Sequence, residues 1–135
     1  KEMDAKEPYL AYMDDNFVEV SVNHGNITSS NEDMLLDIPD KAIKRLKQSY
    51  LVDCEDDIQD IWGCVVSYWE MNGMPQIRKP QGWSAALELY YRTREDLPVN
   101  KAELAASWQI SYSTMMKNYH FINQLIDEFW EQLNL

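Results

Sequence analysis

The chain has 135 residues, of which 45% are hydrophobic and 12% aromatic, so it can bury a core as a single domain. Its formal net charge of -11 repels nucleic-acid phosphate at long range. Four glycines and five prolines are too few for a turn-rich β-sandwich, and no apolar run has the roughly 18 residues of a membrane span.

Residues 1–38 are predicted to be an acidic segment of irregular or short β structure. Residues 17–22 alternate, with three valines on one face, and "NHGN" follows as a turn. This pattern predicts one strand or a short hairpin, which would be marginally stable unless it docked on the helices. The opening "KEMDAKEPYL" shows no apolar signal core.

Residues 39–135 are predicted to form a helical domain, because the hydrophobic period becomes helical at Pro39. In "PDKAIKRLKQSYL", the apolar residues Ile43, Leu46, Tyr50 and Leu51 are predicted to share one face. A solvated helix face is the expected role of the basic residues, with pairing to the acidic N-terminal segment or contact with phosphate as alternatives. These basic residues are Lys41, Lys44, Arg45 and Lys47.

The next predicted helix is "DCEDDIQDIWGCVVSYWEMNG", with acids in its first turn and Gly73 at its end. The acidic cluster lacks the glycine and the alternating oxygen ligands of a calcium loop, so we expect a solvated first turn and no metal site. Cys54 and Cys64 form no CxxC pair. We expect reduced, half-buried thiols, which are typical of a cytoplasmic protein. The inner face is predicted to be Ile58, Ile61, Trp62, Val65, Val66 and Trp69.

A Pro-punctuated linker, "MPQIRKPQG", precedes a third helix at residues 83–93. Pro98 disfavours helix at Leu97 and ends this stretch. Because the tryptophans recur at inner helical positions, we expect them in the core and not as platforms for base stacking. The five are Trp62, Trp69, Trp83, Trp108 and Trp130.

Residues 100–122, "NKAELAASWQISYSTMMKNYHFI", have the outline of a helix-turn-helix. Asn100 is a predicted N-cap with Glu103 at the third helical position, and Ser111 caps the following helix. Ala105 is the small residue at the crossing of the two helices. The inner apolar set is predicted to be Leu104, Trp108, Ile110 and Met115, and the exposed face of the second helix Ser111, Tyr112, Ser113, Met116 and Lys117.

The last helix continues this pattern to Leu133, with apolar residues at alternating spacings of 4 and 3. One apolar strip extends past the end of the motif. Packing on the helix of residues 58–69 is its first expected role, and a homodimer seam is the alternative. The strip consists of Leu125, Phe129, Trp130 and Leu133.

Residues 80–122 resemble a C-terminal helix-turn-helix block of uncharacterised bacterial proteins, "W-x-A-A-L-x-Y" followed by "ELA-x-x-(F/Y)-G-V-S-x-x-T-(I/L)-x-x-x-Y-x-x-(I/L)". They are also similar to the second-repeat helices of the cyclin-like transcription factor B core. The resemblance implies a helix-turn-helix fold and DNA binding. The matching residues are Trp83, Ala85, Ala86, Leu87 and Tyr90, then Glu103, Leu104, Ala105, Ile110, Ser111, Thr114, Met115, Tyr119 and Ile122.

The chain departs from this block in two ways. Gln109 replaces the turn glycine, so it must adopt a left-handed conformation or reshape the turn. The relatives also place Arg or Lys around the second helix, where this chain has Met116, Asn118 and His120. Because phosphate contacts supply most non-specific affinity, this second departure weakens the expectation of DNA binding more than that of the fold.

The sequence predicts a non-enzymatic module without a cofactor. No Ser or Cys lies in a nucleophile motif, no glycine-rich phosphate loop occurs, and His24 and His120 lack a second ligand four residues away. Residues 1–60 hold 15 acids and 6 bases, whereas residues 78–120 hold 6 bases and 4 acids. The helix-turn-helix therefore lies in the least acidic part of the chain.

Two functional hypotheses follow. In the first, a DNA-binding or transcription-regulatory module contacts double-stranded DNA, and a dimer would supply two half-sites. In the second, an acidic protein-protein interaction module uses the helix-turn-helix as a scaffold, with the acidic N-terminal half as partner surface or as a mimic of nucleic-acid charge. The expected DNA contacts are Tyr112, Ser113 and Lys117 on base edges, Ser111 and Thr114 on phosphates, and Arg92, Arg94 and Lys101 at the flank.

Overall fold

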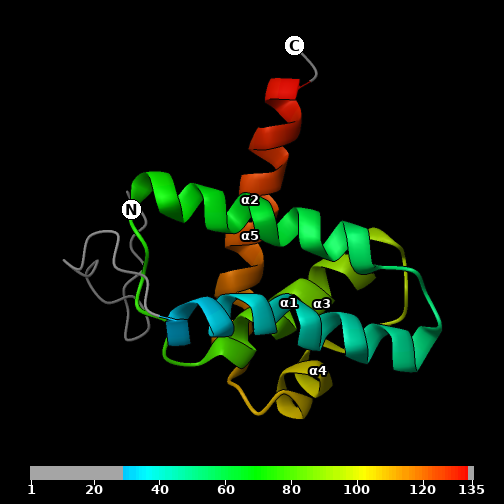
Figure 1. Ribbon diagram of the computed structural model, residues 1–135. Helices are drawn as coiled ribbons and strands as arrows, with labels where there is room; N and C mark the ends of the chain where they lie inside the picture. The colour runs from blue at the N-terminus through cyan, green and yellow to red at the C-terminus, as the bar shows by residue number, and fades with distance from the viewer. Residues whose placement is uncertain (1–28, 134–135) are drawn as a thin grey trace.

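This computed structural model describes residues 29–133, and the side chains of residues 31–130. Within that part the chain forms five helices and no strand, so the predicted mainly α fold is confirmed (Figure 1). The strand or hairpin predicted at residues 17–22, and His24, lie outside the described residues. The helices are α1 (Ser29–Tyr50), α2 (Glu55–Asn72), α3 (Pro80–Arg94), α4 (Lys101–Ser107) and α5 (Tyr112–Leu133).

The central element is α3, which contacts each of the other four helices. Residues 84–91 of this helix are all buried, because neighbours cover it on every side. Its sequence, "SAALELYY", is accordingly apolar around most of its circumference, the pattern of a helix enclosed in a core. The helix starts at Pro80, three residues earlier than predicted, with proline in the first turn where its missing N–H costs nothing.

Two hydrophobic clusters hold the helices together. The larger one joins α1, α2, α3 and α5, and the smaller one joins α3, α4 and α5. Tyr119 of α5 packs against both. The short α4 is thus attached through a small core of its own, beside the main one.

The predicted start of helical structure at Pro39 is wrong, because α1 begins at Ser29 and Pro39 lies inside it. Proline lacks the N–H that would donate to the carbonyl of Leu35, one turn earlier. The indole Nε1–H of Trp62, on α2, donates to that carbonyl at 2.8 Å instead. A side chain from the next helix, α2, therefore donates to this carbonyl and allows α1 to continue through the proline.

Most of the predicted core tryptophans are inside, and one is not. Trp62, Trp69 and Trp108 are buried, and Trp83 is half-buried against the main cluster. Trp130 was predicted to be in the core, but 51% of its surface is exposed. Trp130 belongs to the last turns of α5, and Figure 1 shows these turns (red) extending beyond α2.

Candidate functional site

The two helices of the predicted helix-turn-helix, α4 and α5, are both capped at their N-terminal ends. Asn100 Oδ1 accepts the backbone N–H of Glu103 at 3.0 Å, and Ser111 Oγ accepts that of Thr114 at 3.1 Å. Gln109 has φ 61°, the left-handed conformation expected where the family block has glycine. Its N–H donates to Ala106, and the N–H of Ile110 to Ala105, the pair of bonds that closes a Schellman turn.

The predicted inner positions of the motif are confirmed. Leu104, Ala105, Trp108, Ile110 and Met115 are buried together and form most of the smaller cluster. This burial holds α4 and the start of α5 against α3.

The start of α5 also approaches α3 closely at Gly82. A Cβ built on Gly82 would lie 3.1 Å from a methyl of Thr114 and 3.2 Å from the amide nitrogen of Asn118. Asn118 is only 8% exposed. Position 118 therefore faces α3, and a basic residue there would not belong to the exposed face of α5.

The exposed N-terminal face of α5 carries hydroxyl groups and one aromatic ring. Ser111, Tyr112 and Ser113 are exposed, Tyr112 by 50% of its surface. Thr114 is half-buried, with its methyl toward Gly82 and its hydroxyl accepting from Ser111 at 2.8 Å. Lys117 is also half-buried, and this burial lowers the pKa of its ammonium group.

The two arginines expected at the flank are both paired with carboxylates of the fold, Arg92 in the interior and Arg94 at the surface. Arg92 Nη2 lies 3.0 Å from Glu88, and its Nη1 donates to the carbonyl of Pro98 at 3.4 Å. Arg94 Nη2 lies 3.3 Å from Asp57 of α2. Arg94 is twelve residues from Gly82, about 18 Å along the axis of α3. The structure therefore separates these arginines from the start of α5, whereas Lys101 is exposed at the start of α4.

A buried carboxylate, Glu88 of α3, lies beneath the helix-turn-helix. It is completely shielded from solvent. Its Oε1 accepts the indole N–H of Trp108 at 2.8 Å and lies 3.7 Å from Nε of Arg45. Its Oε2 meets Arg92 as an ion pair without hydrogen-bond geometry. One carboxylate thus links α1, α3 and the end of α4.

Arg45 completes this network from α1. Its guanidinium lies over the ring of Trp108, 4.2 Å from the centroid, and donates to the hydroxyl of Ser107. Arg45 was predicted to lie on a solvated basic face, but it is half-buried, whereas Lys41, Lys44 and Lys47 are exposed. We did not predict Glu88 as an important residue. The sequence does indicate Glu88 by its position inside "AALELYY". Because a helix that is apolar on nearly all sides is enclosed by its neighbours, a carboxylate within it is buried.

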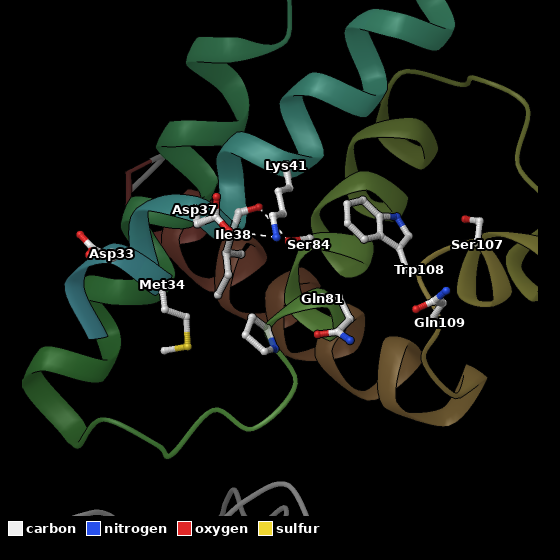
Figure 2. A pocket seen from close by; sticks show the side chains of 11 residues that line it. Asp33, Met34, Asp37, Ile38, Lys41, Gln81, Ser84, Ser107, Trp108 and Gln109 are labelled. Atoms are coloured by element: carbon white, nitrogen blue, oxygen red, sulfur yellow. Dashed lines mark hydrogen bonds and ion pairs between the residues drawn. The ribbon is translucent and has the colours of Figure 1, made fainter. Parts of the chain in front are cut away.

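A pocket of about 650 Å³ opens between α1, the start of α3 and the turn after α4 (Figure 2). Its charged groups are partly paired with each other, since Lys41 Nζ lies 3.1 Å from Asp37. Its buried hydroxyl, on Ser84, donates to the carbonyl of Ile38 at 2.8 Å and so joins α3 to α1. The lining residues are Asp33, Met34, Asp37, Ile38, Lys41, Pro80, Gln81, Ser84, Ser107, Trp108 and Gln109.

The predicted strip at the end of α5 divides into two parts. Leu125 packs against the main cluster, which includes residues of α2, α1 and α3. Phe129 and Trp130 are exposed and lie against each other, with ring centroids 6.2 Å apart. The side chain of Leu133 lies outside the described residues.

The described part of the chain gathers no three His, Cys, Asp or Glu side chains around a possible metal position. Cys54 is fully buried and Cys64 half-buried, and burial raises the pKa of both thiols. Within residues 29–133, no helix has the length and apolar character needed to cross a membrane. Comparison of the chain with protein-family models, with curated proteins and with solved structures gave no match.

Proposed function

We propose that this chain is a non-enzymatic protein-interaction module that uses the helix-turn-helix as a scaffold. The observation that carries the proposal is that Arg92 is paired with the buried carboxylate of Glu88. A cation held by a buried carboxylate has little charge to offer a phosphate, and the pair must be broken before Arg92 can contribute to DNA affinity. Arg94 is paired with Asp57 as well, but at the surface, where an ion pair is weaker.

The charge of the whole chain supports the same proposal. A formal net charge of -11 opposes approach to DNA at long range. Non-specific affinity for DNA grows with the number of phosphates that Lys and Arg neutralise. The cationic side chains expected to contact DNA near the helix-turn-helix are then Lys117 of α5 and Lys101 of α4. Lys117 is half-buried and Lys101 is exposed.

DNA binding is the second candidate, and the turn geometry favours it. Capped helices, the left-handed Gln109 and an exposed N-terminal face on α5 are the features that let such a helix enter a major groove. In this alternative, Tyr112, Ser113 and Lys117 contact base edges.

A salt series separates the two candidates. Labelled random duplex DNA is titrated with the full chain at about 20, 50 and 150 mM salt, with fluorescence anisotropy as the readout. We expect no saturable binding up to about 100 µM protein, which is the weak end of the usual range of non-specific dissociation constants.

Charge-reversal variants control this experiment. Saturable binding that weakens with salt, and that is lost in Lys101→Glu/Lys117→Glu but kept in Lys44→Glu, would overturn the interaction proposal in favour of DNA. Lys44 is a suitable control because it is exposed on α1.

A further inference from the structure

The last turns of α5 carry an apolar surface that no described helix covers. Phe129 and Trp130 are 42% and 51% exposed, although both are large aromatic side chains. Both residues belong to the last two turns of α5. The last turns of this helix extend beyond α2 in Figure 1. Adjacent exposed aromatic residues are typical of contact surfaces, because desolvating them contributes favourably to binding.

Acidic groups surround this aromatic pair. Asp127 and Glu128 precede it and are exposed. Residues 118–135 contain no Lys or Arg, and the last turn of α5 has no basic side chain. The surface formed by Asp127, Glu128, Phe129 and Trp130, here called the α5 end surface, is therefore both apolar and negative.

Charge decides between the possible occupants of the α5 end surface. A second copy of the chain would bring the same acids, and a net charge of -11, against it. The chain's own residues 1–28 hold six acids and two bases, so they carry the same sign. A cationic partner instead pairs with the exposed carboxylates of Asp127 and Glu128.

We infer that the α5 end surface docks a basic amphipathic helix of a partner protein. Such a helix presents apolar residues at spacings of 3 and 4, which cover Phe129 and Trp130, and flanking Lys or Arg side chains, which meet Asp127 and Glu128. This inference rests on the proposed interaction function and names the chemistry of the partner.

The test uses a labelled helical peptide of leucine and lysine in an amphipathic pattern, titrated with the full chain and followed by fluorescence anisotropy. We expect Phe129→Ser/Trp130→Ser to weaken peptide binding at least tenfold. Because both side chains are exposed, the variant keeps the helical circular-dichroism spectrum of the parent. Leu36→Ser/Met71→Ser is the matched control, since these residues are exposed on α1 and α2, and it should bind like the parent.

A second pair of variants tests the charge. Asp127→Asn/Glu128→Gln should weaken binding several-fold at low salt, with a smaller effect at high salt. Asp56→Asn/Asp60→Asn removes two exposed acids from the first half of α2 and should leave binding unchanged.

Four results would overturn the inference. The first is binding of a leucine–glutamate peptide with the same affinity as the leucine–lysine peptide, and the second is the same loss of affinity in the control variants as in Phe129→Ser/Trp130→Ser. The third is binding of a synthetic peptide of residues 1–28 to the α5 end surface. The fourth is a dimer in sedimentation equilibrium that Phe129→Ser/Trp130→Ser dissociates. None of these four results contradicts the proposed interaction function. That proposal is overturned by saturable, salt-dependent binding in the DNA titration.

Discussion

The indole of Trp62 and the backbone of Gln109 each resolve a local conflict between sequence and helix geometry. Trp62 donates to the carbonyl that Pro39 leaves without an intrahelical partner, so α1 passes through a residue that ordinarily ends a helix. Gln109 takes the left-handed conformation that closes α4, although it carries a Cβ. One substitution tests the hydrogen bond of Trp62, and another tests the backbone conformation of Gln109.

The Trp62 contact predicts coupling with Pro39. Trp62→Phe leaves the Leu35 carbonyl unpaired and should lower the free energy of unfolding by about 1–2 kcal/mol, in addition to lost packing. In a Pro39→Ala background the new N–H of residue 39 donates to that carbonyl, so Trp62→Phe should cost less. Urea unfolding of the four proteins measures the coupling. An equal cost in both backgrounds would mean that the hydrogen bond does not support α1.

Gln109→Gly should stabilise the helix-turn-helix. Glycine reaches φ 61° without the Cβ penalty, which is on the order of 1 kcal/mol for other residues. Part of this gain is offset because glycine also increases the entropy of the unfolded chain. Thermal unfolding should therefore show a small rise in Tm, against a fall for Gln124→Gly on the exposed side of α5. A lower Tm for Gln109→Gly would show that the side chain of Gln109 stabilises the turn.

Burial of Cys54 and Cys64 predicts a pH dependence of stability. Burial raises the pKa of both thiols above the ordinary value of 9.0, so the unfolded chain releases these protons more readily than the folded one. The associated stability is present below about pH 9 and is lost as the pH rises through the folded pKa. Cys54→Ala/Cys64→Ala should flatten the fall in unfolding free energy above about pH 9. Identical pH profiles for parent and variant would contradict this assignment.

At the scale of elements, one buried carboxylate fixes how three helices meet. Glu88 of α3 accepts from Trp108 at the end of α4 and is paired with Arg45 of α1 and Arg92 of its own helix. The placement of α4 therefore depends on charged contacts as well as on its small apolar core. A buried ion triad of this kind adds little net stability, but removing one member leaves uncompensated charge.

Glu88→Leu should be more damaging than removal of the whole triad. The single change leaves Arg45 and Arg92 without a counter-charge and Trp108 without an acceptor, at a cost of about 3 kcal/mol, near the lower end for buried pairs because Arg45 reaches solvent. Arg45→Met/Glu88→Leu/Arg92→Met should cost less than the single change. Guanidinium unfolding measures both. A triple variant less stable than Glu88→Leu would show that the network contributes net stability.

For the molecule as a whole, the features that depend on residues close together in the sequence were predictable. The caps at Asn100 and Ser111 and the left-handed Gln109 follow from local hydrogen bonding and sterics. The start of α1 was not predictable, because the group that allows Pro39 belongs to Trp62, 27 residues after its acceptor. The Glu88 network likewise requires three helices to be placed first. The exposure of Trp130 depends on where α5 leaves the body of the fold, which periodicity does not encode.

We propose that partners contact the end of α5 and not its helix-turn-helix face. Amide chemical-shift mapping of the full chain can test this, with duplex DNA in one titration and the leucine–lysine peptide in another. We expect peptide-induced shifts concentrated at residues 125–133, and no saturable DNA-induced shifts at residues 111–117. Saturable shifts at residues 111–117 with DNA, together with an unperturbed α5 end in the peptide titration, would contradict it.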